Sequence, residues 1–485
     1  MHLPREIVLA CCLVAFALRL GPAFQNRFQA DEALYASWAM QIASGRDALL
    51  AGAPVDKPPL SLYAMAAGLF VVGRTEIGAR LANLIASVVS VALAWRLART
   101  LAALHGAWRT GALAALLMAL SPFNIAFAGT TFLDPLMVVW GLASCVAAAR
   151  GRAGLAGVCL GLAGAAKVQG LLFAPLTILT AMGSQDAGQR KLSALTVEDA
   201  VRFAAGFGAI IAAIFAWSLA RGGTPFWAQQ AINYGGIRLA FAAELAPRLS
   251  GWLGWMPYLF GMPMTAVVGA ACAWLALTAV MNRPRTPASA IDLLLLVYVL
   301  GFFGLHWLLA FPVWDRYLLI LVPVLAVLAD RAYSRSQLAI RPRWRWAIFG
   351  AVALLMLPDA IRASRSEFPI GGDHGPHDGI DRVAAYLRDL PAGTVLYDHW
   401  LGWEFDYYLW DAPLYRAYVD TPADLANDLR AFGRTSARHI VLPAAESTGK
   451  IERAIAAEGY SLTPVLTVTN RFGQTSFVVY QIAPQ

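Results

Sequence analysis

Charged residues are scarce in this chain of 485 residues: 14% of them are Asp, Glu, Lys or Arg, whereas 59% are hydrophobic. A soluble globular protein carries roughly 25% charged residues. The basic residues do not gather into a patch with interleaved aromatic residues, as nucleic-acid binding would require; they separate long apolar runs. The composition therefore indicates a polytopic membrane protein and argues against nucleic acid as a partner.

Lysine and cysteine are also few. The 38 basic residues include only four lysines, and the five cysteines all fall inside apolar runs. Neither a disulfide framework nor a metal-binding cysteine spacing is present. The absence of any Asn-x-Ser/Thr acceptor site fits a prokaryotic source. With so few lysines, each one in an apolar context is a candidate functional group.

Apolar runs predict the membrane-spanning helices, which need about 20 residues, or fewer where protein shelters them. We expect eleven spans, including a first helix that is retained because no small-residue cleavage site follows it. Residues 153–183 are divided at AAKVQG, because they are too long for one span. The expected spans are 6–24, 78–98, 110–128, 133–149, 153–166, 168–183, 203–220, 253–280, 291–311, 317–330 and 344–358.

Arginine distribution predicts the orientation. Gaps rich in basic residues alternate with poorer ones, and the positive-inside rule assigns the rich gaps to the cytoplasm. Eleven crossings from an inside N-terminus then leave the polar C-terminus outside. The basic residues of the cytoplasmic gaps are Arg96, Arg99, Arg109, Arg150, Arg152, Arg190, Lys191, Arg283, Arg285, Arg331, Arg335, Arg341, Arg343 and Arg345.

Residues 25–77 form a large outward loop in this topology. It contains DEALYASWAMQIASG and PPLSLYAMAAGLFVVG, which we expect to be helices along the outer membrane surface. Asp31 and Glu32 open the first helix, where acidic residues also complement the helix dipole and cap free N–H groups. Capping alone would explain this pair if no other unusual charges accompanied it.

The last 120 residues have the composition of a soluble domain. We expect a transmembrane domain over 1–360, a linker over 361–379 and an extracytoplasmic α/β domain over 380–485. The glycines of GGDHGPHDG indicate a solvated linker, although its histidines and aspartates could instead bind a metal. Helices and strands alternate afterwards, as in a small α/β fold. No phosphate-binding glycine motif or nucleophile elbow occurs there, so we interpret this domain as a binding or scaffolding unit.

Ionisable residues at membrane depth are expensive and are functional candidates by default. In the predicted topology the unusual charges all converge on the outer face, which scattered structural charges would not do. Arg19 lies one turn inside that face, and we expect it to pair with a carboxylate. The outer-face group comprises Asp31, Glu32, Lys57, Asp134, Lys167, Asp315, Arg316 and Tyr317.

These residue types suit group transfer from a lipid phosphate. Carboxylates can deprotonate a hydroxyl or hold a divalent metal. Lysine and arginine can neutralise a phosphate and absorb the negative charge that develops on a phosphate leaving group. Two alternatives compete with this chemistry: a transporter or lipid flippase, whose charges should line a path between both faces, and a non-catalytic assembly protein.

The sequence resembles the polyprenyl-phosphate-sugar-dependent glycosyltransferases of the GT-C fold. Within them it is similar to the branch that contains protein O-mannosyltransferase-like proteins and the lipid A 4-amino-4-deoxy-L-arabinose transferase. The resemblance covers about residues 5–330. It rests on ADEALYASWAMQIASG, DKPPLSLYAMAAGLFVVG, TTFLDPLMVVWGLA, GLAGAAKVQGLLFAPL and RYLLILVPVLAVLA.

The resemblance implies an inverting hexosyl or pentosyl transferase in the bacterial inner membrane, with its C-terminal domain on the periplasmic side. Asp31 corresponds to the catalytic carboxylate, and Asp134 to a second acid/base or acceptor-orienting group. Lys57 would hold the donor phosphate, assisted by Arg316 and Lys167, while the supporting residues would be Glu32, Tyr35 and Tyr317. The donor would be a polyprenyl- or undecaprenyl-phosphate sugar, and the acceptor a lipid such as lipid A, a glycan or a protein of the cell envelope.

Two departures from the family pattern leave questions open. The family often has Glu before Lys-Pro-Pro, where this chain has Asp56. A divalent metal therefore stays open, with Asp31 and Asp56 as its candidate ligands. Ala166 replaces the threonine that usually precedes the hairpin lysine, so Lys167 is either a phosphate ligand or a structural charge. Likewise, Asp134 is either a functional carboxylate or a helix cap.

Overall fold

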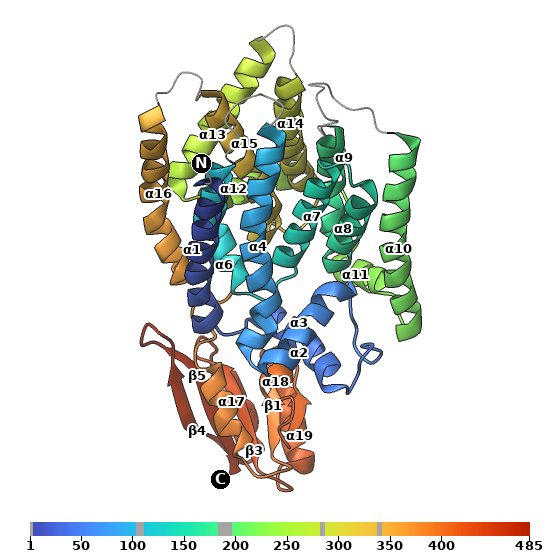
Figure 1. The fold of residues 1–485 in the computed structure, drawn as a ribbon. Helices are drawn as coiled ribbons and strands as arrows, with labels where there is room; N and C mark the ends of the chain where they lie inside the picture. Colours follow the sequence, from blue (N-terminus) through green and yellow to red (C-terminus); the bar gives the residue numbers. More distant parts are fainter. Residues whose placement is uncertain (1–2, 103–110, 183–195, 282–286, 337–341) are drawn as a thin grey trace. The chain divides into compact units, whose positions relative to one another are not determined.

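The computed structural model describes residues 3–102, 111–182, 196–281, 287–336 and 342–485. These residues form two compact units, each made of two stretches of chain. The first unit consists of Met1–Phe24 and Gln41–Gly371, and the second of Gln25–Met40 and Gly372–Gln485. Figure 1 shows that the first unit is a helical bundle and that the second contains the sheet.

The described part of the first unit consists of helices and their connections, with one isolated β-bridge between Leu239 and Leu309. Helix α2 (Ala30–Ser44) begins in the second unit and ends in the first. The remaining helices of the first unit are α1 (Leu3–Gln25), α3 (Pro59–Val72), α4 (Glu76–Ala102), α5 (Ala112–Leu120), α6 (Pro122–Ala128), α7 (Asp134–Ala148), α8 (Ala153–Ala166), η2 (Val168–Phe173), α9 (Ala174–Met182), α10 (Val197–Arg221), α11 (Phe226–Tyr234), α12 (Ala242–Trp255), η3 (Met256–Tyr258), α13 (Met262–Met281), α14 (Pro287–Leu308), η4 (Asp315–Ile320), α15 (Leu321–Ser336) and α16 (Pro342–Ser364).

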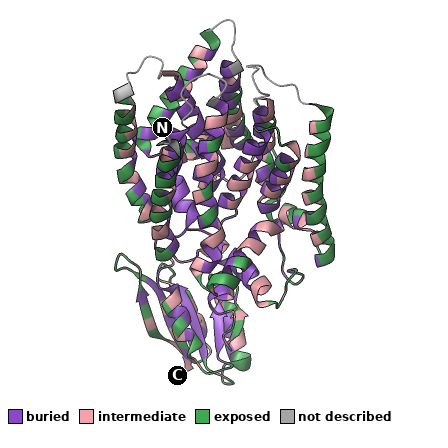
Figure 2. Ribbon diagram, viewed as in Figure 1, coloured by how far each residue is buried: buried purple, intermediate pink, exposed green. Residues whose placement is uncertain are grey.

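The helices confirm a multi-pass membrane protein. Among the described residues, seven helical segments are long and apolar enough to cross a membrane, and four shorter apolar helices accompany them. Their burial differs: 94% of the apolar stretch in Asp315–Ser336 is buried, but only 11% of that in Val197–Arg221 (Figure 2). The exposed apolar face of α10 is therefore suited to contact lipid. The expected number of eleven spans stays a prediction.

Three breaks in the helices bear on the expected spans. The prediction of one continuous helix over 110–128 is wrong, because Ser121 is extended and Pro122 starts α6 without a backbone N–H to donate. The expected helix over 253–280 is also interrupted, by η3 and by Gly261 at φ +82°. The predicted division at AAKVQG is confirmed, since Lys167 is extended between α8 and η2.

Buried polar groups and small residues hold the bundle together. Arg19 of α1 is fully buried and donates to the carbonyl oxygens of Met118 and Ala119, each at 3.0 Å, and to Ser87 Oγ at 2.8 Å. Arg19 thus ties α1 to α4 and α5 through neutral oxygens, and the expected pairing with a carboxylate is wrong in the described part of the chain. Helices α8 and α10 approach closely, because a Cβ on Gly157 would lie 2.1 Å from Phe203 O.

Several arginines expected in cytoplasmic gaps lie in helices, and their side of the membrane stays a prediction. Arg331 and Arg335 lie within α15, and both form ion pairs with Asp292 of α14. Arg96 and Arg99 are likewise helical, near the end of α4. The residues of this group that fall outside the described ranges are Arg109, Arg190, Lys191, Arg283, Arg285 and Arg341.

The second unit contains a five-stranded sheet in the order β2-β1-β3-β5-β4. Strand β1 is parallel to β2 and β3, whereas β5 is antiparallel to β3 and β4. Helices and strands alternate after residue 380 as expected, which confirms a small C-terminal α/β fold. The elements are α17 (Ile380–Arg388), β1 (Val395–Asp398), α18 (Gly402–Tyr408), β2 (Tyr415–Tyr418), α19 (Pro422–Phe432), β3 (Arg438–Pro443), α20 (Gly449–Ala456), β4 (Tyr460–Thr469) and β5 (Thr475–Pro484).

The segment before α17 is packed into this unit. Asp373 is 3% exposed and Asp378 is 8% exposed, so the expectation that these side chains are solvated is wrong. His377 lies between two carboxylates: its Nδ1 is 2.9 Å from Asp373 Oδ1, and its Nε2 is 3.4 Å from Glu404 Oε1. Burial lowers the pKa of His377, but the hydrogen bonds and charges of the two carboxylates outweigh burial and raise the pKa to about 9.

This arrangement predicts that the second unit loses stability as the pH rises. The folded-state pKa of His377 lies above the unfolded value of 6.5, so its contribution is complete below pH 6.5 and disappears as the pH passes about 9. At roughly 1.4 kcal/mol per pKa unit, the loss should approach about 3 kcal/mol. Hydrogen exchange of peptides from 395–443 in the full chain, corrected for intrinsic rates, measures it. His377→Gln should remove the pH dependence, and equal protection of the wild type at pH 6 and 9 would contradict the assignment.

Candidate active site

The first charged pair lies directly before α3. Lys57 Nζ is 2.6 Å from Asp56 Oδ2 and 3.1 Å from Tyr234 OH, and it lies 4.9 Å from the centre of the Tyr234 ring. Asn233 Nδ2 donates to the same Asp56 oxygen at 3.0 Å. Lys57 is 8% exposed and Asp56 is 3% exposed. The ammonium is thus held by a carboxylate and an aromatic face in a nearly dry environment.

The second charged pair joins two further helix ends. Lys167 Nζ is 2.6 Å from Asp134 Oδ1 and 4.6 Å from the centre of the Tyr317 ring. Asp134 is 1% exposed. Its alternative role as the cap of α7 is not supported, because Leu133 occupies the cap position and no side-chain capping bond is present there. The carboxylate instead compensates the buried ammonium.

Aromatic residues bring the two pairs into one site. The Trp314 ring centre lies 6.2 Å from that of Tyr234, beside Lys57, and 5.6 Å from that of Tyr317, beside Lys167. The Arg316 guanidinium lies 4.2 Å from the Trp314 ring centre and 4.4 Å from that of Phe132. Stacking on two rings fixes the plane of the guanidinium.

Lys167 lies in the break between α8 and η2, and Asp134 compensates its buried charge. The rings of Tyr234, Trp314 and Tyr317 link Lys57, Arg316 and Lys167 in space. Lys57, Lys167 and Arg316 supply positive charge to this region, and Asp56, Asp134 and Asp315 supply negative charge.

Proline and helix ends explain why the chain folds this way here. Pro59 begins α3 directly after the Lys57-Pro58 turn, and Pro135 is the second residue of α7, after Asp134. Proline is favoured at the start of a helix because its missing N–H would have no helical acceptor. Ser61 Oγ donates to Ala166 O at 3.1 Å, which ties α3 to the residue before Lys167. The charged side chains therefore lie where helices begin or end.

Asp315 supports this region through backbone groups. Its Oδ1 accepts a hydrogen bond from the Arg316 backbone N–H at 2.7 Å, and its Oδ2 accepts one from Gly371 N–H at 2.9 Å. The carboxylate thus fixes the start of η4, which carries Arg316 and Tyr317. Asp315 therefore holds the backbone of Arg316 in place.

The remaining predicted residues belong to the second unit. Asp31 and Glu32 lie in the first turn of α2, and Glu32 is fully buried. Tyr35 is 4% exposed and packs against Trp38 with ring centres 6.0 Å apart. The first unit thus holds Lys57, Asp134, Lys167, Arg316 and Tyr317, whereas the second holds Asp31, Glu32 and Tyr35.

Sequence reasoning missed Asn233, Tyr234 and Trp314. The first two lie at the end of α11, in a stretch whose aromatic residues could cover a sugar or lipid or could equally form an interfacial belt. Their contact with Asp56 and Lys57 spans 177 residues of chain. The many aromatic residues of this stretch could have indicated a role in the site, but they do not show that Tyr234 is the one that contacts Lys57.

A metal site is not assembled by the residues that the structure describes. No group of three or more His, Cys, Asp or Glu side chains there could hold a metal ion. One oxygen of Asp56, a candidate ligand, already accepts hydrogen bonds from Lys57 and Asn233. We therefore assign Asp56 to the lysine rather than to a metal.

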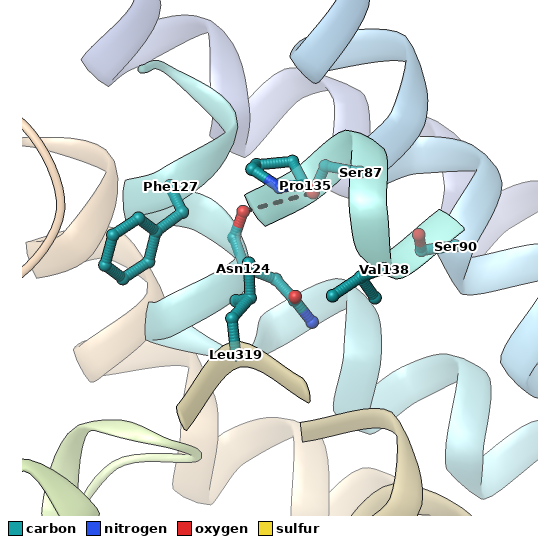
Figure 3. A pocket seen from close by; sticks show the side chains of 7 residues that line it. All are labelled: Ser87, Ser90, Asn124, Phe127, Pro135, Val138 and Leu319. Carbon is teal, nitrogen blue, oxygen red and sulfur yellow. Dashed lines mark hydrogen bonds between the residues drawn. The ribbon is translucent and has the colours of Figure 1, made fainter. Parts of the chain in front are cut away.

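A small cavity lies beside the charged cluster within the bundle. Pro135, next to Asp134, and Leu319, close to Tyr317, both line it (Figure 3). Ser87 Oγ donates to Asn124 O at 3.1 Å across its wall. Its lining residues carry no charge; they are Ser87, Ser90, Asn124, Phe127, Pro135, Val138 and Leu319.

Part of the chain matches a known protein family. Residues 56–217 match the family described as dolichyl-phosphate-mannose-protein mannosyltransferase. This stretch includes Lys57, Asp134 and Lys167 and ends before Arg316. A comparison with curated protein sequences gave no match.

Solved structures resemble the fold of nearly the whole chain. ArnT from Cupriavidus metallidurans bound to undecaprenyl phosphate is 15% identical, with a TM-score of 0.60 over 98% of this chain and 97% of that one. An Archaeoglobus fulgidus oligosaccharyltransferase in complex with Zn and sulfate is 12% identical, with a TM-score of 0.53 over 97% and 72%. Arabinofuranosyltransferase AftD from Mycobacteria is 16% identical, with a TM-score of 0.52 over 98% and 41%.

The buried Lys167–Asp134 pair gives a testable expectation for stability. Lys167→Met leaves the Asp134 charge buried without its ammonium and should lower the free energy of unfolding by about 3 kcal/mol. Lys167→Met combined with Asp134→Leu should recover most of this loss, because no lone charge remains. Thermal unfolding in detergent measures both.

The matched control is an exposed pair, Arg202–Glu198, whose side chains are 64% and 69% exposed. Arg202→Met should change stability by less than about 1 kcal/mol. Equal destabilisation by the single and the double variants at the buried pair would show that Asp134 does not depend on Lys167.

Proposed function

We propose that this chain is a glycosyltransferase with the GT-C fold, and that it transfers a sugar from a polyprenyl-monophosphate donor to an acceptor at the outer face of the bacterial inner membrane. The observation that carries the proposal is the cluster of Lys57, Lys167 and Arg316 at the ends of apolar helices. A monophosphate on a lipid is the anion that suits three cations beside aromatic rings at membrane level. The alternative of a transporter or lipid flippase gains no support.

The cations act on the leaving group. As the acceptor oxygen forms a bond to the anomeric carbon, the bond from that carbon to the phosphate oxygen breaks, and negative charge grows on the polyprenyl phosphate. Lys57 and Arg316 neutralise this charge, with Lys167 assisting from its pair with Asp134. Arg316 offers a planar fork and Lys57 a compact point charge, so the two recognise different phosphate oxygens.

Asp31 receives the proton of an acceptor hydroxyl in this proposal. A single displacement inverts the anomeric centre and needs one base, with no carboxylate nucleophile. Glu32 and Tyr35 support the start of α2, Tyr317 supports Lys167, and Asp134 orients the acceptor or serves as a second acid/base. If the acceptor is itself a phosphate, no base is needed and Asp31 orients it instead.

The partners follow from this chemistry. The donor is a polyprenyl- or undecaprenyl-linked sugar, and the acceptor is a lipid, a glycan or a protein of the cell envelope. We place the α/β domain on the periplasmic side and assign residues 1–360 to the transferase domain, 361–379 to the linker and 380–485 to the α/β domain.

The proposal is tested by turnover of a labelled polyprenyl-phosphate sugar in proteoliposomes, scored as released polyprenyl phosphate. Asp31→Asn and Lys57→Ala should each lower turnover by about a hundredfold or more, the order that removal of a general base or of a charge-stabilising group costs. Asp47→Asn, in the same loop, and Lys450→Ala, in α20, are the matched controls and should retain turnover. A chelator arm decides whether a divalent metal is required.

Turnover of both variants at the wild-type rate would reduce Asp31 to a helix cap and Lys57 to an interfacial lysine. The search would then move to Asp134 and to transport of the lipid across the membrane. Loss of turnover in Asp47→Asn as well would indicate that the whole loop is sensitive, so the effect of Asp31→Asn could not be assigned to its carboxylate.

The orientation is tested separately. A cysteine introduced at Lys450, with the five native cysteines replaced, should react in intact cells with a thiol reagent that cannot cross the membrane. Labelling only after the cells are lysed would place the α/β domain in the cytoplasm and would change the number of crossings from odd to even.

A further inference from the structure

The segment that precedes α2 is held by the C-terminal α/β fold. Arg471 lies in the turn that joins β4 to β5, and its guanidinium donates to Gln25 O at 3.1 Å and to Asn26 Oδ1 at 3.2 Å. These contacts link positions about 445 residues apart in the chain. They are made within the second compact unit, which contains both stretches.

The turn that carries Arg471 is itself fixed. Asp378 accepts three hydrogen bonds from Arg471: from the backbone N–H at 2.9 Å, from Nε at 2.7 Å and from Nη2 at 2.7 Å. Asn470 Oδ1 accepts bonds from Phe472 N–H at 2.9 Å and from Gln474 N–H at 3.0 Å, which closes the turn. Because Asp378 holds one edge of the Arg471 guanidinium, the remaining N–H donors point in a fixed direction, toward Gln25 and Asn26.

A second contact holds the same segment two residues closer to α2. Phe28 is fully buried, and its backbone N–H donates to Tyr408 OH of α18 at 3.1 Å. Its ring packs against Tyr407 and Tyr408, with centres 4.8 and 6.2 Å apart. Arg27 adds an ion pair with Asp381 of α17 at 3.4 Å.

These contacts end where the first turn of α2 begins. Ala33 N–H donates to Gln29 O at 2.9 Å, so the helix starts at Ala30, two residues after Phe28. Asp31 is three residues from Phe28, a distance that an extended chain spans in about 10 Å. A displacement of Phe28 therefore moves the backbone that carries Asp31, because only two residues lie between them.

We propose that the α/β domain positions Asp31 for activation of the acceptor. Arg471 and Tyr408 are the residues that hold the segment before Asp31 in place. The inference rests on the proposed function, because it assigns to Asp31 the proton of the acceptor. Neither residue touches the reacting atoms. Each instead fixes the backbone near Asp31. The carboxylate must lie within about 1 Å of its correct position to deprotonate a hydroxyl efficiently.

The first measurement is hydrogen exchange in the full chain in nanodiscs. Arg471→Ala and Tyr408→Phe should each increase exchange in peptides from 25–40 while peptides from 438–443 in β3 stay protected. Arg430→Ala is the matched control: Arg430 forms a two-pronged pair with Glu458 on the same domain, far in sequence from 25–40, and its loss should leave exchange in 25–40 unchanged. Unchanged exchange in 25–40 for Arg471→Ala and Tyr408→Phe would overturn the proposal.

The second measurement is turnover with the labelled donor. Arg471→Ala should lower kcat about tenfold with little change in the donor KM, and Arg471→Lys, which can keep the pair with Asp378, should restore part of the loss. In an Asp31→Asn background, Arg471→Ala should cause no further loss, because there is no base left to misplace. A merely structural role of Arg471 would lower turnover by the same factor in both backgrounds.

The outcomes separate this inference from the proposed function. Increased exchange with unchanged kcat, while Asp31→Asn is inactive, would overturn positioning and leave the proposed function intact. If Asp31→Asn retains full turnover, the proposed role of Asp31 fails, and with it the assignment of Arg471 to the reaction. Increased exchange would then show only that the domain anchors the segment.

Discussion

A charge surrounded by apolar side chains must be paired or placed where a helix ends, and this constraint determines the arrangement of the site. An isolated ammonium or carboxylate at membrane depth costs several kcal/mol. Lys57 and Lys167 each meet the requirement with one carboxylate and one aromatic ring, at distances of 2.6 Å to the carboxylate oxygen in both cases. Both lysines also lie next to helix ends, where backbone groups without a helical partner add to the local polarity.

The same constraint fixes the directions of the side chains at the proposed phosphate site. The rings of Trp314 and Phe132 hold the Arg316 guanidinium in one plane. In the proposed reaction a phosphate would therefore enter without a rearrangement of these side chains. Preorganised cations of this kind stabilise a leaving group more than mobile ones do.

Local patterns determined most of what could be predicted. The polarity of residues 380–485 gave every helix and strand of the α/β fold, and AAKVQG gave the break at Lys167, because each depends on periodicity or on a charge within a few residues. Ser121-Pro122 divides an expected span for an equally local reason, the missing N–H of proline, which the apolar content of 110–128 concealed. The partners of Arg19 were not predictable, because backbone carbonyls of a distant helix satisfy a guanidinium as well as a carboxylate does and leave no mark in the sequence.

Contacts between remote stretches account for the rest. Asn233 and Tyr234 reach Asp56 and Lys57 across 177 residues, and Arg471 reaches Asn26 across 445. Such contacts depend on how the helices and strands fold in three dimensions, which no spacing rule within a single sequence encodes. The sequence placed the Asp31 segment with the outward loop, yet its hydrogen bonds join it to the C-terminal sheet domain. The chain thus enters the second unit twice, and residues 25–40 are covalently continuous at both ends with stretches of the first. A carboxylate on such a segment is fixed by tertiary contacts more than by its own helix, since a helix of 15 residues has little stability in isolation.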